Sequence, residues 1–197
     1  DVHRDGTPDI ISGTGRYQRE TGCAFVYSGR DGSVLHEFYG AMEGSFLGHS
    51  VASAGDVNGD GSADVIVGAS GTSGPGVATV FSGADGSALF TFPGEHENDG
   101  MGGGVSGGRD LNGDGTPDFV VSAQARGRND IGIVFAYSGK DGSLLWQLAG
   151  ATRLERLGYG NDALRAIPDV NGDGNDDVVV GSWSAPGIGP SAPAGSQ

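Results

Sequence analysis

The chain has 197 residues, enough for one domain or for part of a longer repeat array, and 40 of them are glycine. Its formal net charge of −14 argues against nucleic acid or an anionic membrane as a partner. No apolar run reaches the length of a membrane-spanning helix, so membrane insertion is not expected. Apolar residues instead occur in short runs separated by turns, which is typical of a protein built from many short β-strands.

A nine-residue motif rich in Asp occurs four times along the chain. Its copies occupy residues 1–9, 56–64, 110–118 and 169–177, at spacings of 55, 54 and 59 residues. The last three copies share the pattern Asp-Xaa-Asn-Gly-Asp-Gly and have a further Asp at position nine. The first copy has His3 and Arg4 in place of Asn and Gly. A regular spacing of this length indicates an internal repeat.

Each copy is followed by the same series of elements. An apolar run follows the motif, then come a Gly- and Ser-rich connection, a second run, an Asp-Gly turn and a third run. A fourth short run precedes the next motif. Asp-Gly between apolar runs favours a hairpin, because Gly accepts the positive φ that tight turns require. Strands are therefore expected at 9–11, 64–69, 118–123 and 177–182, at 23–28, 77–82 and 133–138, at 34–38, 88–92 and 144–148, and at 49–54, 103–106 and 159–164.

These strands predict an all-β chain. No window has a convincing helical period, and tandem units of four antiparallel strands and about 55 residues indicate β-propeller blades. We expect an open arc of about three to four blades. Its parts are a blade without its first strand at 1–40, blades at 41–93 and 94–149, a partial blade at 150–187, and a flexible Pro-, Ala-, Ser- and Gly-rich tail at 188–197.

The Asp motifs predict Ca²⁺ sites, because hard cations bind oxygen ligands on loops that Gly allows to turn sharply. One bare copy would also make a good turn, but repeated oxygen ligands at positions one, three, five and nine exceed what a turn needs. Position seven is expected to contribute its backbone carbonyl. The three expected sites are Asp56, Asn58, Asp60, Ser62 and Asp64; Asp110, Asn112, Asp114, Thr116 and Asp118; and Asp169, Asn171, Asp173, Asn175 and Asp177.

A fourth and weaker Ca²⁺ site is expected at Asp1, Asp5 and Asp9. Imidazole is a poor ligand for a hard cation, and Arg4 adds positive charge to this loop. An EF-hand is excluded, because its acidic position twelve is Val67, Val121 or Val180 in the other loops and no helices flank them. Mg²⁺ is less favoured because it keeps its water, and no His and Cys cluster suits Zn²⁺.

No catalytic residue and no organic cofactor site is predicted. The sequence has neither a nucleophile elbow nor a phosphate-binding Gly loop, and its four His residues are scattered. We expect His49 to be structural and Trp146 to lie in the core, while Trp183 follows a strand and is open to either interpretation.

The segment from Phe46 to Ala52, together with the following Asp motif and Val65–Ser70, resembles an FG-GAP repeat. This repeat builds the seven-bladed propeller at the head of integrin α-subunits and occurs in many secreted bacterial proteins. The third unit keeps the pattern loosely as Met101-Gly102-Gly103-Gly104, and the fourth as Leu157-Gly158-Tyr159-Gly160. No copy reads Gly-Ala-Pro.

The resemblance implies a calcium-stabilised propeller module, extracellular or at the cell surface, that serves in adhesion or binds a protein or glycan without catalysing a reaction. Further blades of the same polypeptide are among the partners it implies. An alternative is a fragment of a secreted propeller enzyme, of the polysaccharide lyase or phospholipase type, with its catalytic residues outside this chain. A truncated product that binds only Ca²⁺ is a further alternative.

Overall fold

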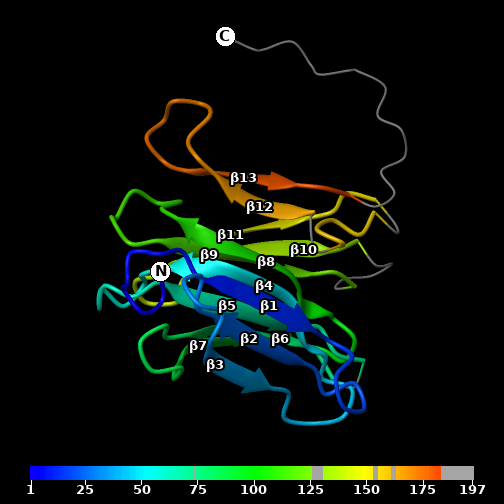
Figure 1. The fold of residues 1–197 in the computed structure, drawn as a ribbon. Helices are drawn as coiled ribbons and strands as arrows, with labels where there is room; N and C mark the ends of the chain where they lie inside the picture. Colours follow the sequence, from blue (N-terminus) through cyan, green and yellow to red (C-terminus); the bar gives the residue numbers. More distant parts are fainter. Residues whose placement is uncertain (73, 126–130, 153–154, 161–162, 183–197) are drawn as a thin grey trace.

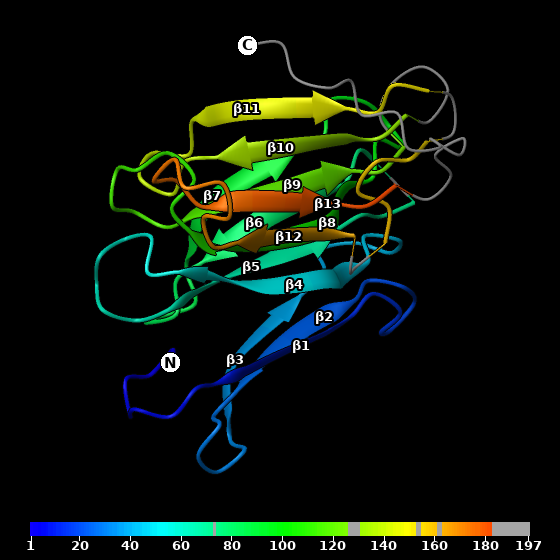
Figure 2. The same cartoon turned by 90° about the horizontal axis from the view of Figure 1, so that it is seen from above.

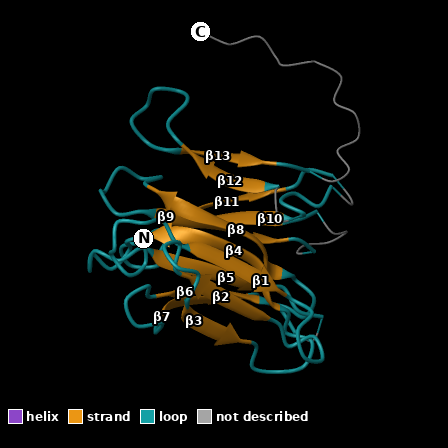
Figure 3. Ribbon diagram, in the orientation of Figure 1, coloured by secondary structure: helices purple, strands orange, loops and turns teal. Residues whose placement is uncertain are grey.

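The computed structural model describes residues 1–197 except 73, 126–130, 153–154, 161–162 and 183–197 (Figure 1). The described residues form strands and loops and no helix (Figure 3). None of them belongs to a helix of the length and apolar character that crossing a membrane requires. The predicted tail, the end of the partial blade and Trp183 lie outside the described residues.

The strands form four antiparallel sheets in which chain neighbours pair. The first sheet contains β1 (Ile10–Thr14), β2 (Cys23–Tyr27) and β3 (Val34–Tyr39). The second contains β4 (Leu47–Gly55), β5 (Asp64–Ala69), β6 (Val77–Phe81) and β7 (Ala88–Pro93). The third contains β8 (Met101–Arg109), β9 (Asp118–Ala123), β10 (Ile133–Tyr137) and β11 (Leu144–Ala149). The fourth contains β12 (Leu164–Ile167) and β13 (Asp177–Val180).

The sheets lie face against face in an open arc. The first strands of the second, third and fourth sheets, β4, β8 and β12, lie side by side, and β1 packs against β4 (Figure 2). This arrangement confirms the predicted all-β class with blades of four antiparallel strands. The limits of the individual blades within the sequence stay a prediction.

The second and third sheets explain why these residues form strands. Every residue of β5 and β9 is buried, as expected for apolar runs covered on both faces. Ile66, Val80, Phe119 and Val121 are fully buried in the largest core cluster. Complete burial of side chains of this size stabilises the fold by about 1.5–3 kcal/mol each.

An aromatic pair is repeated at successive sheet contacts. Phe38 of the first sheet stacks on Phe81 of the second, with ring centroids 4.2 Å apart. Phe92 of the second sheet stacks on Tyr137 of the third at 4.1 Å. The two pairs occupy equivalent register positions, so the repeat in sequence is also a repeat in packing.

Two expectations about the last units are wrong. The strand expected at 159–164 is instead β12 at Leu164–Ile167, which runs close to the Asp motif as β4 and β8 do. Gly158 and Gly160, which precede this strand, have positive φ values of 71° and 106°. Trp146, on the outer strand β11 of the third sheet, is 36% exposed rather than in the core.

Candidate metal centres

The four Asp motifs occur at equivalent places in the sheets. The second, third and fourth motifs connect β4 to β5, β8 to β9 and β12 to β13, and the first leads into β1. In an antiparallel meander these connections lie at the same end of the sheet as the Asp-Gly turns after β2, β6 and β10. The motif between β12 and β13 is the orange loop at the upper left of Figure 1.

The Asp at position nine joins its motif to the hairpin turn of the same sheet. Asp118 Oδ2 accepts a hydrogen bond from the Leu111 N–H at 2.8 Å, and its Oδ1 accepts one from the Gly139 N–H at 2.9 Å. Asp64 accepts equivalent bonds from Val57 and Gly83, both at 2.9 Å. Asp64 and Asp118 are completely buried, so each carboxylate holds the strand start against the turn.

The first and fourth copies use position nine in a related way. Asp9 accepts hydrogen bonds from the N–H groups of Val2 and Gly29. Asp177 accepts one from the Val170 N–H at 2.8 Å. Sequence reasoning placed these carboxylates but missed their bonds to Gly29, Gly83 and Gly139, although those Gly residues begin each Asp-Gly turn.

The Asp at position one organises the backbone of its own loop. Asp56 accepts hydrogen bonds from the N–H groups of Asp60 and Gly61, at 3.0 and 2.9 Å. Asp110 and Asp169 accept bonds from Gly115 and Gly174 at the same loop position. Since the carboxylates already face inward, the loops do not need to refold to present oxygen atoms.

Positions three and five complete each loop. Asn58 Oδ1 accepts from the Asp60 N–H at 3.0 Å, and Asp60 Oδ1 accepts from the Ser62 N–H at 2.8 Å. The same two bonds occur at Asn112 and Asp114, then Thr116, and at Asn171 and Asp173, then Asn175. An ionised carboxylate has about four lone-pair sites, so these bonds leave oxygen capacity for a cation. The donor set contains only oxygen and therefore fits a hard divalent cation.

The environment raises the pKa of some motif carboxylates and lowers that of others. Burial raises the pKa of Asp64 and Asp118, although backbone N–H groups oppose this effect. Burial also acts on Asp110, but the N–H groups of Gly115 and Gly113 outweigh it and lower the pKa. The N–H groups of Gly174 and Gly172 lower the pKa of Asp169. A nearby cation would favour ionisation of the two buried groups.

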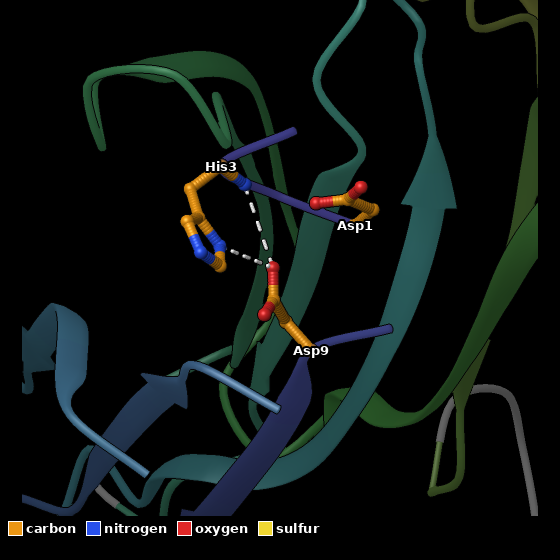
Figure 4. A group of neighbouring side chains, drawn as sticks. All are labelled: Asp1, His3 and Asp9. Atoms are coloured by element: carbon orange, nitrogen blue, oxygen red, sulfur yellow. Dashed lines mark hydrogen bonds and ion pairs between the residues drawn. The ribbon is translucent and has the colours of Figure 1, made fainter. Parts of the chain in front are cut away.

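The first motif differs because it contains two basic residues, His3 and Arg4. Figure 4 shows His3 beside Asp9. His3 Nδ1 lies 3.0 Å from Asp9 Oδ2, and His3 Nε2 lies 3.0 Å from Asp5 Oδ2. The hydrogen bond to Asp9 raises the pKa of His3. Among the described residues, Asp1, His3 and Asp9 form the one group of three acidic or histidine side chains whose ligand atoms lie within 4.8 Å.

The same motif holds one unsatisfied oxygen. Asp5 Oδ2 is buried and accepts no hydrogen bond of good geometry, although His3 is close to it. Burial works against ionisation of Asp9, but the N–H groups of Gly29 and Val2 lower its pKa to about 2. Asp1 and Asp9 therefore lie together with His3, and the basic side chains of His3 and Arg30 approach Asp5.

Neighbouring motifs also contact one another. The N–H of Ala63, at position eight, donates to the Asp1 carbonyl at 3.1 Å, and the N–H of Asp176 donates to the Asp110 carbonyl at 2.9 Å. The third motif has Pro117 at this position and lacks the N–H. Asp176 Oδ2 also accepts from the Asp110 N–H at 3.2 Å. Sequence reasoning assigned Asp176 no role, because spacing within one motif does not reveal a contact between motifs.

A groove runs along the first strands of the sheets and reaches Gly55, Arg109 and Pro168, which directly precede three of the Asp motifs. It has a volume of about 800 Å³ and is lined by β4, β8 and β12, with Ser50, Ser106, Arg109 and Arg165 among its polar residues. Among the described residues, those that line this groove include no Asp or Glu.

Comparison with protein families and relatives agrees with the repeat. A family described as FG-GAP-like repeat matches residues 56–121. Integrin alpha pat-2 of Caenorhabditis elegans is 33% identical over 216 residues, covering 94% of this chain and 17% of that protein. Integrin alpha-V of Gallus gallus is 28% identical over 202 residues, covering 93% of this chain and 19% of that protein. The chain thus spans less than a fifth of the length of these relatives.

Two solved structures with a similar fold are rhamnogalacturonan lyases. The rhamnogalacturonan lyase of Bacillus licheniformis has a TM-score of 0.58 at 23% identity, over 92% of this chain and 38% of that one. The rhamnogalacturonan lyase YesW has a TM-score of 0.56, also at 23% identity and with the same coverage. At this identity the likeness shows a common fold.

Proposed function

We propose that this chain, which carries FG-GAP-like repeats, is a calcium-binding propeller module that is extracellular or at the cell surface and binds a protein or glycan without catalysing a reaction. The supporting observation is the set of three loops, 56–64, 110–118 and 169–177, with the same inward-facing oxygens at the same end of the sheets. The integrin relatives support a role in adhesion.

In this proposal each ion links structure that the chain already brings together. Asp56, Asn58 and Asp60 bind it from the loop, with the Ser62 carbonyl, and Asp64 binds it from the start of β5. Because Asp64 also holds the Gly83 turn, ion binding would stabilise the connection between strands and the hairpin beside it. The first motif is proposed as a weaker fourth site.

Chelation tests the calcium part of the proposal. A ligand at a hundredfold excess over its Kd stabilises the folded state by about 2.7 kcal/mol per site. For a chain of this size, that corresponds to a Tm shift of about 5–10 °C per site. Melting with Ca²⁺ and with EDTA should show this difference. Equal melting curves would mean that the Asp motifs act only as turns.

A glycan array and an extracellular-protein array, each with Ca²⁺ and with EDTA, test ligand binding. Binding that is lost in EDTA supports the proposed module. Lack of binding on both arrays together with a calcium-dependent Tm leaves the third alternative, a product that binds Ca²⁺ and nothing else.

The second candidate function is a part of a propeller enzyme. The fold shared with the rhamnogalacturonan lyases favours this candidate, and the groove along β4, β8 and β12 offers room for an extended polar ligand. The test is cleavage of an acidic polysaccharide by this chain, measured through the appearance of unsaturated products. Such cleavage would overturn the non-catalytic proposal.

A further inference from the structure

The first and second motifs meet through an arginine. Arg4 Nε donates a hydrogen bond to Ser62 Oγ at 2.8 Å, and Arg4 Nη2 lies 3.2 Å from Asp60 Oδ1. A Cβ placed on Gly61 would lie 3.6 Å from three atoms of the Arg4 guanidinium, so this group packs closely against the loop. Ser62 is 2% exposed, and the contact therefore reaches into the loop rather than across its surface.

Arg4 contacts two residues that contribute ligands to the proposed calcium site. Asp60 is a proposed ligand at position five, and Ser62 is the residue whose carbonyl is proposed at position seven. Position four, where Arg4 stands in the first motif, is Gly59, Gly113 or Gly172 in the others. Arg4 has φ of +61°, a conformation that Gly adopts without strain, so its side chain is present at some local cost.

The other described contact between motifs has the opposite charge. There the neighbouring motif brings Asp176, whose carboxylate faces the start of the third motif at Asp110. A carboxylate near a cation site strengthens binding of the cation, whereas a guanidinium weakens it. The two contacts between motifs therefore bias their sites in opposite directions.

We infer that Arg4 sets the calcium affinity of the second loop: it binds Asp60 and Ser62 when no ion is present, and an ion must displace it. The inference rests on the proposed calcium function and deepens it. It predicts that the loop 56–64 binds Ca²⁺ more weakly than the loops 110–118 and 169–177, although all three have the same sequence pattern.

The test is calorimetric titration of the whole chain with Ca²⁺, using Arg4→Gly and Arg4→Gln. Gln removes the charge and keeps a donor for Ser62, so it separates electrostatics from the hydrogen bond. Because Arg4 is half exposed, its field is partly screened, and both variants should raise the affinity of one site by roughly threefold to tenfold. Raising the salt concentration should shrink this difference.

Two controls test whether the change in calcium affinity arises at the second loop. Arg30→Gly removes an exposed arginine that approaches Asp5 at 3.8 Å, and no contact with the second loop is described for it, so the affinity of the second loop should not change. In a chain whose second loop is disabled by Asp56→Asn and Asp60→Asn, Arg4→Gly should leave the affinities of the loops 110–118 and 169–177 unchanged, and any remaining gain belongs to the first motif, which contains Arg4.

The outcomes separate the two claims. Unchanged or weaker binding in both Arg4 variants, with normal binding by the unmodified chain, overturns the role of Arg4 and leaves the calcium function in place. No calcium binding by the unmodified chain overturns the calcium function, and the inference with it. Circular dichroism in EDTA confirms that the variants fold.

Discussion

The first and second Asp motifs occupy equivalent places but balance their carboxylates differently. In both, position nine joins the motif to a hairpin turn, and position one accepts hydrogen bonds from the N–H groups at positions five and six. The first motif then places His3 between Asp5 and Asp9. The second motif has Asn58 there and carries no basic side chain of its own.

From this difference we infer that the hydrogen-bonded loop and the proposed ion site are separable properties. The loop is built by backbone N–H groups that point at carboxylates, and all four copies have it. In the proposed sites the positive charge comes from a bound ion, whereas the first motif carries the basic side chains of His3 and Arg4. A motif can therefore keep its structural role in the sheet after its pattern of metal ligands has changed.

The largest effect is expected at the buried carboxylate that both kinds of loop share. Asp118→Ala leaves the N–H groups of Leu111 and Gly139 without their acceptor in a fully buried place. We expect a loss of about 2–4 kcal/mol in the free energy of unfolding, with or without Ca²⁺. Urea unfolding in Ca²⁺ and in EDTA measures it.

Asp114→Asn is the control for this variant. Asp114 lies at the exposed position five of the same motif, so its replacement should matter mainly when Ca²⁺ is present. If Asp118→Ala lowered stability only in Ca²⁺, the separation of loop and ion site would be wrong.

An intermediate effect is expected when the first motif is given the pattern of the others. The double variant His3→Asn, Arg4→Gly removes both protein cations and restores Asn and Gly at positions three and four. Asp5 and Asp9 then lack the imidazole between them, and the loop loses the positive charge of Arg4, so we expect one additional tight calcium site per chain by calorimetry. Stability in EDTA should fall slightly. An unchanged number of sites would show that the loop geometry, not its cations, limits binding.

The smallest effect concerns pH and lies outside the motifs. Burial lowers the pKa of His49 below 6.5, so folding favours its neutral form. A lowered folded-state pKa stabilises the protein above the unfolded-state pKa, and this contribution is lost as the pH falls through 6.5 towards the folded value. In EDTA, the unmodified chain should therefore lose more stability between pH 7.5 and pH 5.5 than His49→Gln. An equal loss of stability in the unmodified chain and in His49→Gln would exclude this contribution. Loss of stability caused by protonation of carboxylates occurs in both proteins and therefore cancels in the comparison.

Much of the fold was predictable because the repeat consists of residues with strong preferences for strands or for turns. The Asp-Gly turns and runs such as Val65–Ala69 and Phe119–Ala123 indicated strands close to those observed. The strand at Leu164–Ile167 was misplaced because its sequence is less apolar and the Gly residues before it obscure its start. Trp146 was misjudged because burial of an outer strand depends on the next sheet, which no local pattern reports.

The candidate site was predictable only within each motif. Spacing identified the oxygen-bearing residues of each motif, and in the first motif Asp1 and Asp9 lie close together, with His3 beside them. It did not reveal that Arg4 reaches Asp60, 56 residues away, or that Asp176 faces Asp110, 66 residues away. Such contacts depend on how one sheet is stacked on the next, which follows from the packing of the aromatic pairs.

Those aromatic pairs also have a consequence for local opening. The second sheet is packed against a neighbour on both sides. Phe81 of this sheet stacks on Phe38 of the first sheet, and Phe92 stacks on Tyr137 of the third. At the equivalent register place on the third sheet, Leu148 is 50% exposed. In a linear array, the stability of a unit depends on its own folding and on its neighbours. Amide hydrogen exchange should therefore be slowest in β5 and β9 and fastest in β12 and β13, giving a gradient that follows the stack rather than the sequence of any one strand.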